Sequence, residues 1–248
     1  LSKEVIFKDV TDEIACFGVF GPKSRDLMSK LSNDNFSKEN FKFGNGKKIT
    51  INDKEVFAQR LSYVGELGWE LYVSMSQAKE IYNTIVKTGK EFEISLCGTL
   101  SMDTMRMETG YLHWGHDISP EENQYQAGLQ FAISYKKNID FIGKESLLKI
   151  KNKKDTKKFA MLTLNDSKPG EPLLLHDEPI YLDNKIIGRT TSGNFSFNFN
   201  KNLSFGYINS ELSNIDLVKG NFFIEVEKIK YSASIILKPL NNKEIRNL

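Results

Sequence analysis

The sequence predicts an α+β protein whose first part mixes helices with strands and whose last part consists of short strands. Strand-like and helix-like segments alternate through the first half of the chain, which is typical of an α/β or α+β domain. After Phe159 the helical periodicity disappears, and short apolar runs alternate with Gly, Asn and Ser turns. That spacing is typical of a small antiparallel barrel or sandwich.

The first part is expected to open with a strand, a helix and a β-hairpin. Residues 5–19 are apolar and β-like, and the turn at 21–25 leads into a helix. The apolar stripe of that helix is Leu27, Met28 and Leu31. Further strands are expected at 49–51, 56–58, 60–63 and 69–73, of which the last two form the arms of a hairpin.

Two helices are expected after the hairpin. Ser76 is the predicted N-cap of a helix that ends near Thr88, with Ala78, Ile81, Tyr82 and Ile85 on its apolar face. A second helix is expected from about Gly98 to Thr109, ended by Gly110. Its methionines are expected to face the core: Met102, Met105 and Met107.

Between about Tyr135 and Lys158 the composition shifts to lysine and asparagine. We interpret this segment as an exposed helix end and a linker; the alternative is a basic rim that meets an acidic tail on a ligand. The domain boundary is therefore predicted between residues 154 and 155, which gives domains 1–154 and 155–248. Six strands are expected in the second domain, at 161–164, 178–182, 186–191, 203–207, 222–226 and 233–237.

The composition excludes several classes of protein. Basic and acidic side chains nearly cancel, 34 against 32, so no overall field favours nucleic acid or anionic lipid as a partner. No apolar run is long enough to span a bilayer, and no secretory signal is present. Cys16 and Cys97 lack a CxxC partner and are predicted to be buried reduced thiols. We expect a cytoplasmic protein and, because the chain begins at Leu1 without Met, the remainder of something longer.

The first candidate site is the segment from Arg60 to Leu71. Gly65 and Gly68 allow a flat ligand to approach the main chain. Tyr63 and Glu70 lie seven residues apart and flank the same predicted turn. A carboxylate that accepts two hydrogen bonds suits a guanidine-like ring edge, such as the amino-pyrimidinone of a pterin. The alternative is an ordinary hairpin with exposed acids and a core Trp.

The second candidate segment runs from Ser101 to Ile118. Asp103 and Arg106 are three residues apart on the predicted helix, close enough to pair. His116 next to Asp117 is compatible with an acid/base pair, but a loop histidine in a structural hydrogen bond is the simpler interpretation. His113 and His116 would need further ligands to bind a metal, and the sequence supplies none, so no metal site is predicted.

Together these segments resemble the glycine-cleavage T-protein (aminomethyltransferase) superfamily. The resemblance extends over nearly the whole chain and is carried by several motifs in the same order. They are Gly21–Arg25, Arg60–Val73, Met102–Ile118, Ala127–Leu129, Phe141–Lys144, Gly170–Pro172, Gly188–Gly193 and Leu203–Ile208. The resemblance implies a folate-binding α/β domain, incomplete at its N-terminus, followed by a small antiparallel β-barrel.

One position points to a branch of this superfamily. The T-proteins proper carry an arginine that helps hold folate where this chain has Met102, whereas the sarcosine and dimethylglycine dehydrogenase branch does not. The resemblance to that branch implies a domain that captures on tetrahydrofolate the one-carbon unit of an oxidised N-methyl amine. It also implies FAD, as the cofactor of an upstream oxidase or dehydrogenase domain or subunit, and a small methylated amine as the donor.

The resemblance also implies roles for individual residues. Glu70 matches the acid that binds the pterin, Tyr63 the aromatic residue beside it, and Phe131 a folate-contacting tryptophan. An Asp103–Arg106 pair would position the helix beneath the site. The family's Thr-Pro-x-Glu is replaced by 123–126, Asn-Gln-Tyr-Gln. The aspartate that assists methylene transfer precedes the start of this chain, so we assign no catalytic residue.

Two other functions share this scaffold. One is a stand-alone folate-dependent aminomethyltransferase or demethylase. The other is a folate-binding module without turnover, as in the superfamily members linked to tRNA modification and iron–sulfur proteins. Those members carry a Lys-Gly-Cys motif, whereas 110–115 contains no cysteine here, which argues against the second function.

Overall fold

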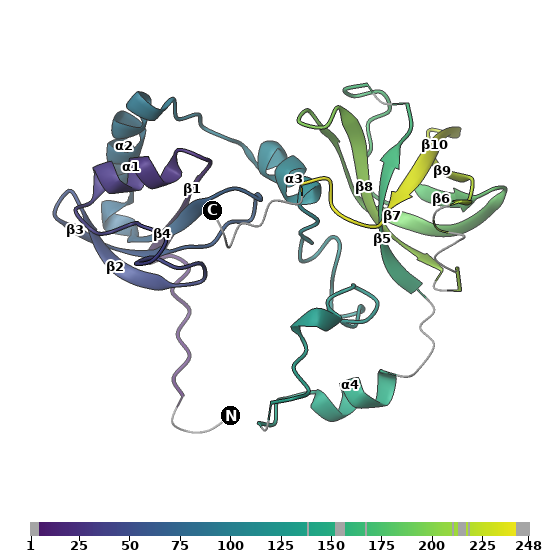
Figure 1. Cartoon of the computed structure of the whole chain (residues 1–248), viewed down its shortest axis with the longest axis horizontal. Coiled ribbons are helices and arrows are strands. Elements are labelled where there is room, and N and C mark those ends of the chain that lie inside the picture. The colour runs from purple at the N-terminus through teal and green to yellow at the C-terminus, as the bar shows by residue number, and fades with distance from the viewer. Residues whose placement is uncertain are drawn as a thin grey trace. The chain divides into compact units, whose positions relative to one another are not determined.

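The computed structural model describes residues 5–137, 139–151, 157–166, 168–209, 211–212, 217 and 219–241. The chain divides into two compact units, of which one extends to Met102 and the other begins at Asp103. The first is a helix-covered sheet and the second contains a closed barrel (Figure 1). The predicted α+β class and the predicted barrel are thereby confirmed. The boundary predicted between residues 154 and 155 lies outside the described residues.

The first unit is built on a four-stranded antiparallel sheet. Its strand order is β1 (Ile14–Phe20), β4 (Gly68–Ser74), β3 (Lys54–Gln59) and β2 (Gly46–Ile51). The helices α1 (Ser24–Leu31) and α2 (Met75–Gly89) pack against each other and against one face of this sheet (Figure 1). A short 3₁₀ helix, η1 (Lys90–Phe92), follows α2.

The core of the first unit lies between the sheet and these helices. Because side chains alternate along a strand, Trp69, Leu71 and Val73 of β4 all point towards the helices, and each is at most 1% exposed. The rings of Phe36 and Phe41 meet Trp69 edge-on, with centroids 5.6 and 5.8 Å away. Trp69 is therefore a core residue.

The sequence predicted most of these elements, with three corrections. Of the β-like opening at 5–19, only the part from Ile14 lies in a strand. The stripe of α1 is buried as expected, but the N-cap of α2 is Ser74 rather than Ser76. Residues 60–63 do not form a strand. The Arg60 backbone N–H bonds to Asn45 O and its buried guanidinium donates to Phe41 O at 2.8 Å, so the chain leaves the sheet after Gln59.

The second unit begins within α3 (Thr99–Glu108) and continues through η2 (Gln130–Ala132) and α4 (Lys144–Ile150) into the barrel. Six antiparallel strands close in the order β10-β5-β8-β7-β6-β9. Every predicted strand of this region overlaps one of them. They are β5 (Lys157–Leu164), β6 (Pro179–Leu182), β7 (Lys185–Ser196), β8 (Lys201–Asn209), β9 (Phe222–Val226) and β10 (Ile229–Ile236).

A buried ion pair joins α3 and the loop that follows it to the barrel. Arg106 and Asp117 are each 1% exposed and form a short salt bridge. Arg106 also donates to Asp103 Oδ1 at 2.7 Å and to Ser192 Oγ on β7 at 2.7 Å. Asp117 Oδ1 in turn accepts from Ser192 at 2.8 Å and from Thr191 at 2.6 Å. Each charge therefore has several partners, which a buried charge requires.

The burial of two of the three expected core methionines on α3, and of both thiols, differs from prediction. Met107 is buried beside Leu203 and Phe205, but Met102 is 37% exposed and Met105 is only partly buried. The buried face of α3 is set near its end by Met107 and the Arg106 ion pair. Cys16 and Cys97 are exposed: Cys16 alternates onto the sheet face that the helices leave free, and Cys97 precedes α3 in irregular chain.

Replacement of Gly188 by Ala is expected to destabilise the barrel. An added Cβ would lie 1.9 Å from the backbone oxygen of Tyr207 on the neighbouring strand, so the two strands would have to separate. We expect the free energy of unfolding to fall by about 1–3 kcal/mol, measured by urea denaturation and circular dichroism. Gly98→Ala is the control, since nothing lies within 4 Å of its added Cβ. Equal stability of the two variants would contradict the described contact.

Replacement of Asp117 by Asn is expected to cost more, because it leaves the Arg106 charge buried with a weakened set of partners. We expect a loss of about 3–5 kcal/mol in the free energy of unfolding. Asp103→Asn removes a carboxylate from the same guanidinium, but the Asp103 side chain is 26% exposed, and about 1 kcal/mol is expected. Similar losses in both variants would show that Asp117 is not the principal partner.

Candidate functional site

Glu70 lies on the face of the first sheet opposite to the helices. Its neighbours in the strand, Trp69 and Leu71, are buried in the core, so Glu70 and Tyr72 point to the other side. The paired residues of the adjacent strands alternate in the same way. We call this side the open face, and it comprises Cys16, Gly18, Phe20, Phe57, Gln59, Glu70 and Tyr72.

A hydrogen bond joins the two polar side chains at the centre of the open face. The Tyr72 hydroxyl donates to Glu70 Oε2 at 2.7 Å. This bond, together with burial and the carboxylate charge, raises the pKa of Tyr72 to about 12, because each favours the neutral phenol. Burial, and then the Glu70 charge, raises the pKa of Cys16 on the neighbouring strand. The phenol is therefore a donor to the carboxylate at every physiological pH.

The space beside Glu70 is bordered by glycine and by an aromatic ring. Gly18 is the cross-strand partner of Glu70, and Gly68 lies two residues before it. Cβ atoms added at these two glycines would lie 2.4 and 2.3 Å from ring carbons of Phe20. The Phe20 ring thus rests against both glycines, next to the strand position of Glu70. Phe20 was not among the predicted site residues, although its even spacing from Gly18 on β1 places both on one face.

A groove of about 810 Å³ lies along the part of the open face that contains Phe57, Gln59 and Tyr72. Its lining includes Tyr72, which bonds Glu70, and Gln59, which pairs with Glu70 across the ladder. Phe57 and Ile14 add apolar surface, with the Phe57 and Tyr72 rings 6.1 Å apart. The size lies in the range of small-molecule sites. Two neighbours of the half-buried carboxylate therefore line the groove, whereas Glu70 itself is not among its described lining residues.

The predicted arrangement, in which Tyr63 and Glu70 flank the turn of one hairpin, differs from the structure. Tyr63 lies in the connection between β3 and β4, not on a strand arm, and its side chain is partly buried. Phe131 belongs to η2 in the second unit, and its ring is 82% exposed. Their proposed contacts with a ligand stay predictions.

The predicted pairing of Asp103 with Arg106 is confirmed by their 2.7 Å contact. Asp117, which was not predicted as a partner, is the fully buried partner of the same arginine. Asp117 also accepts the backbone N–H of His113 at 2.9 Å, so its carboxylate is directed into this network. The rings of His113 and His116 lie 4.5 Å apart. Across the described ranges, no cluster of three or more His, Cys, Asp or Glu side chains could hold a metal ion.

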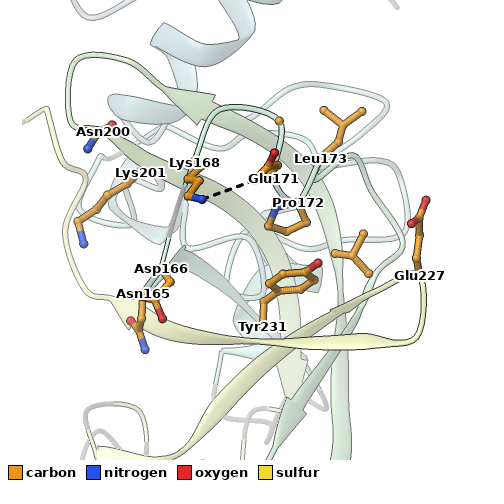
Figure 2. Close-up of a pocket in the computed structure, with 12 residues that line it drawn as sticks. Asn165, Asp166, Lys168, Glu171, Pro172, Leu173, Asn200, Lys201, Glu227 and Tyr231 are labelled. Carbon is orange, nitrogen blue, oxygen red and sulfur yellow. Dashed lines mark ion pairs between the residues drawn. The ribbon is translucent and has the colours of Figure 1, made fainter.

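A second cavity, of about 880 Å³, lies in the barrel unit and is drawn in Figure 2. Tyr231 and Pro172 supply apolar surface, and Lys168 forms an ion pair with Glu171 at 3.9 Å. Further lysine and acidic side chains line it, namely Lys201, Asp166 and Glu227. Because both signs of charge are present, this cavity favours no single charged class of ligand.

No helix in the described part of the chain is long and apolar enough to cross a membrane.

Family models match both parts of the chain. The GCVT N-terminal domain matches residues 1–137, and the glycine cleavage T-protein C-terminal barrel domain matches residues 157–241. A solved structure, the glycine cleavage system aminomethyltransferase T from Bartonella henselae, is similar with a TM-score of 0.77. It shares 19% sequence identity over 92% of this chain and 59% of its own, which supports the fold.

Several curated relatives align along most of the chain. Mitochondrial dimethylglycine dehydrogenase of Homo sapiens is 35% identical over 241 residues, 96% of this chain and 27% of the relative. The formaldehyde-forming 4-methylaminobutanoate oxidase of Paenarthrobacter nicotinovorans is 32% identical over 93% of this chain and 27% of its own. An aminomethyltransferase of Halothermothrix orenii is 32% identical over 80% of this chain and 54% of its own.

The chain therefore spans about a quarter of the length of the oxidase and dehydrogenase relatives. The matched models together cover most of its residues, and they occur in the same order as the two parts of the fold. The chain belongs to the glycine cleavage T-protein (aminomethyltransferase) family.

Proposed function

We propose that this chain binds tetrahydrofolate on the open face and accepts a one-carbon unit from an oxidised N-methyl amine such as sarcosine or dimethylglycine. The family membership supports a folate-dependent role. The similarity to dimethylglycine dehydrogenase over 96% of the chain favours an N-methyl amine as the donor. The half-buried Glu70 carboxylate beside a groove is the structural observation that carries the proposal.

The open face fits a reduced pterin. Within the described part of the chain, the Glu70 carboxylate accepts one hydrogen bond, from Tyr72 at 2.7 Å, and its two oxygens together can accept about four. The edge of a pterin offers adjacent N–H donors, which a carboxylate accepts in parallel. Gly18 and Gly68 let the Phe20 ring lie close to the sheet beside Glu70, and this ring and the groove supply apolar surface. Tetrahydrofolate, when bound, supplies the amine nitrogens that take up the one-carbon unit.

The remaining roles follow the family resemblance. Tyr63 and Phe131 would add apolar contacts to the ligand, and the Asp103–Arg106 pair would hold α3 in its conformation. The aspartate that assists transfer in the family has no assigned counterpart in this chain. An FAD-binding oxidase or dehydrogenase domain or subunit is the proposed partner, since the relatives that suggest it are about four times longer than the matched region. The cytoplasmic location stays a prediction.

A stand-alone aminomethyltransferase is the second candidate. The match to 54% of the Halothermothrix orenii aminomethyltransferase favours it, because that relative is more completely covered than the dehydrogenases are. A turnover assay with tetrahydrofolate and either sarcosine or formaldehyde separates an enzyme from a folate-binding module. Turnover without an added flavoprotein would favour the stand-alone transferase.

Replacement of Glu70 by Ala is expected to abolish measurable tetrahydrofolate binding, a loss of about 100-fold or more, because two charge-assisted hydrogen bonds disappear. Calorimetric titration measures the affinity. The melting temperature should change little, since Glu70 faces away from the core.

Glu80→Ala is the matched control. Glu80 is an exposed acid of helix α2, outside the open face, and accepts a hydrogen bond from Asn52 at 2.6 Å, so its removal should leave the affinity intact. An unchanged affinity in Glu70→Ala would refute the assignment of the folate site.

A further inference from the structure

We propose that Tyr72 is a positioning residue, which fixes the Glu70 carboxylate so that its free lone pairs point to the edge of the pterin. This inference rests on the proposed function and extends it to a residue that the family resemblance did not mark. The hydrogen bond of 2.7 Å between the Tyr72 hydroxyl and Glu70 Oε2 carries it.

The bond restrains a side chain that has few other restraints. Among the described residues, Tyr72 is the one hydrogen-bond partner that the Glu70 carboxylate has. A glutamate has three side-chain torsions, and ordering them on binding costs free energy. A carboxylate already held in place avoids part of that cost. Its cross-strand neighbour Gly18 has no side chain that could do so.

Tyr72 itself is well fixed. It lies on β4, and its ring packs against that of Phe57 on β3, with centroids 6.1 Å apart. On the other side it pairs with Cys16 of β1. The hydroxyl is thus delivered from a central strand of the sheet, which is a more rigid support than the loop that carries Tyr63.

The direction of the Tyr72–Glu70 hydrogen bond determines which groups of a ligand the carboxylate can bind. The phenol donates to Oε2, so the carboxylate stays an acceptor towards the groove and recognises donors rather than acceptors. A ring edge with two adjacent N–H groups fits this arrangement, as in a 2-amino-4-oxo pteridine. A pteridine that lacks the 2-amino group would leave part of the carboxylate without a partner and should bind more weakly.

The first test compares affinities for tetrahydrofolate by calorimetry. Tyr72→Phe removes the hydroxyl and keeps the ring, so we expect binding about tenfold weaker with an unchanged melting temperature. The preference for the 2-amino pteridine over its 2-deamino analogue should fall as well. Tyr82→Phe, on helix α2, removes a hydroxyl outside the open face and should bind as the wild type does.

The outcomes separate this inference from the proposed function. If Glu70→Ala loses binding but Tyr72→Phe keeps wild-type affinity and selectivity, the positioning role is wrong and the folate site stands. If Glu70→Ala binds as the wild type does, or the wild type does not bind, the folate site is wrong and the inference falls with it.

A second measurement tests the contact without any ligand. The Glu70 bond is the largest cause of the raised pKa of Tyr72, which is about 12. In Glu70→Gln the pKa of one tyrosine, followed by ultraviolet absorbance, should therefore fall towards the ordinary value near 10. An unchanged titration would overturn the inference, because the hydroxyl would then not be bonded to the carboxylate.

Discussion

The two-residue alternation of side chains along β4 is the constraint on which the candidate site depends. Trp69, Leu71 and Val73 occupy the core between sheet and helices, and their burial fixes the register of the strand. Glu70 and Tyr72 are consequently held on the opposite face. A shift by one residue would bury a carboxylate and expose a tryptophan, both at high cost. The packing of the hydrophobic core thus determines the face of the sheet on which Glu70 lies, although Glu70 is not part of that core.

The second unit uses a different device to hold its polar groups. Arg106 and Asp117 are both excluded from water. In addition to the ion pair, Arg106 donates to Ser192 Oγ, and Asp117 accepts from the hydroxyls of Ser192 and Thr191 on β7. The desolvation of such a pair costs about as much as the attraction returns. Its effect is directional, because the helix end and the loop around His113 have one arrangement that satisfies every partner. The pair therefore specifies a conformation more than it adds stability.

Much of this architecture could be predicted from the sequence. The barrel strands follow from short apolar runs between turns, and the stripe of α1 from its spacing. The connection after Gln59 could not be predicted, because Arg60 leaves the sheet through bonds to Asn45 and Phe41, which are distant in sequence. The same limit explains why Asp117 was missed as a partner of Arg106. Periodicity describes which face a residue occupies, but not which distant residue meets it.

In the candidate site too, contacts within one strand could be predicted from the sequence, whereas contacts between strands could not. Glu70 was found through a motif, yet its hydrogen bond to Tyr72 joins two residues on one strand and follows from alternation alone. Phe20 is reached only through the β1–β4 pairing, which brings Gly18 and Gly68 against its ring. Glu70 lies beside an aromatic ring that is seated on two glycines, and the Tyr72 hydroxyl limits its freedom to turn away. The proposed folate site would therefore owe its affinity to the rigidity of the sheet as much as to the charge it presents.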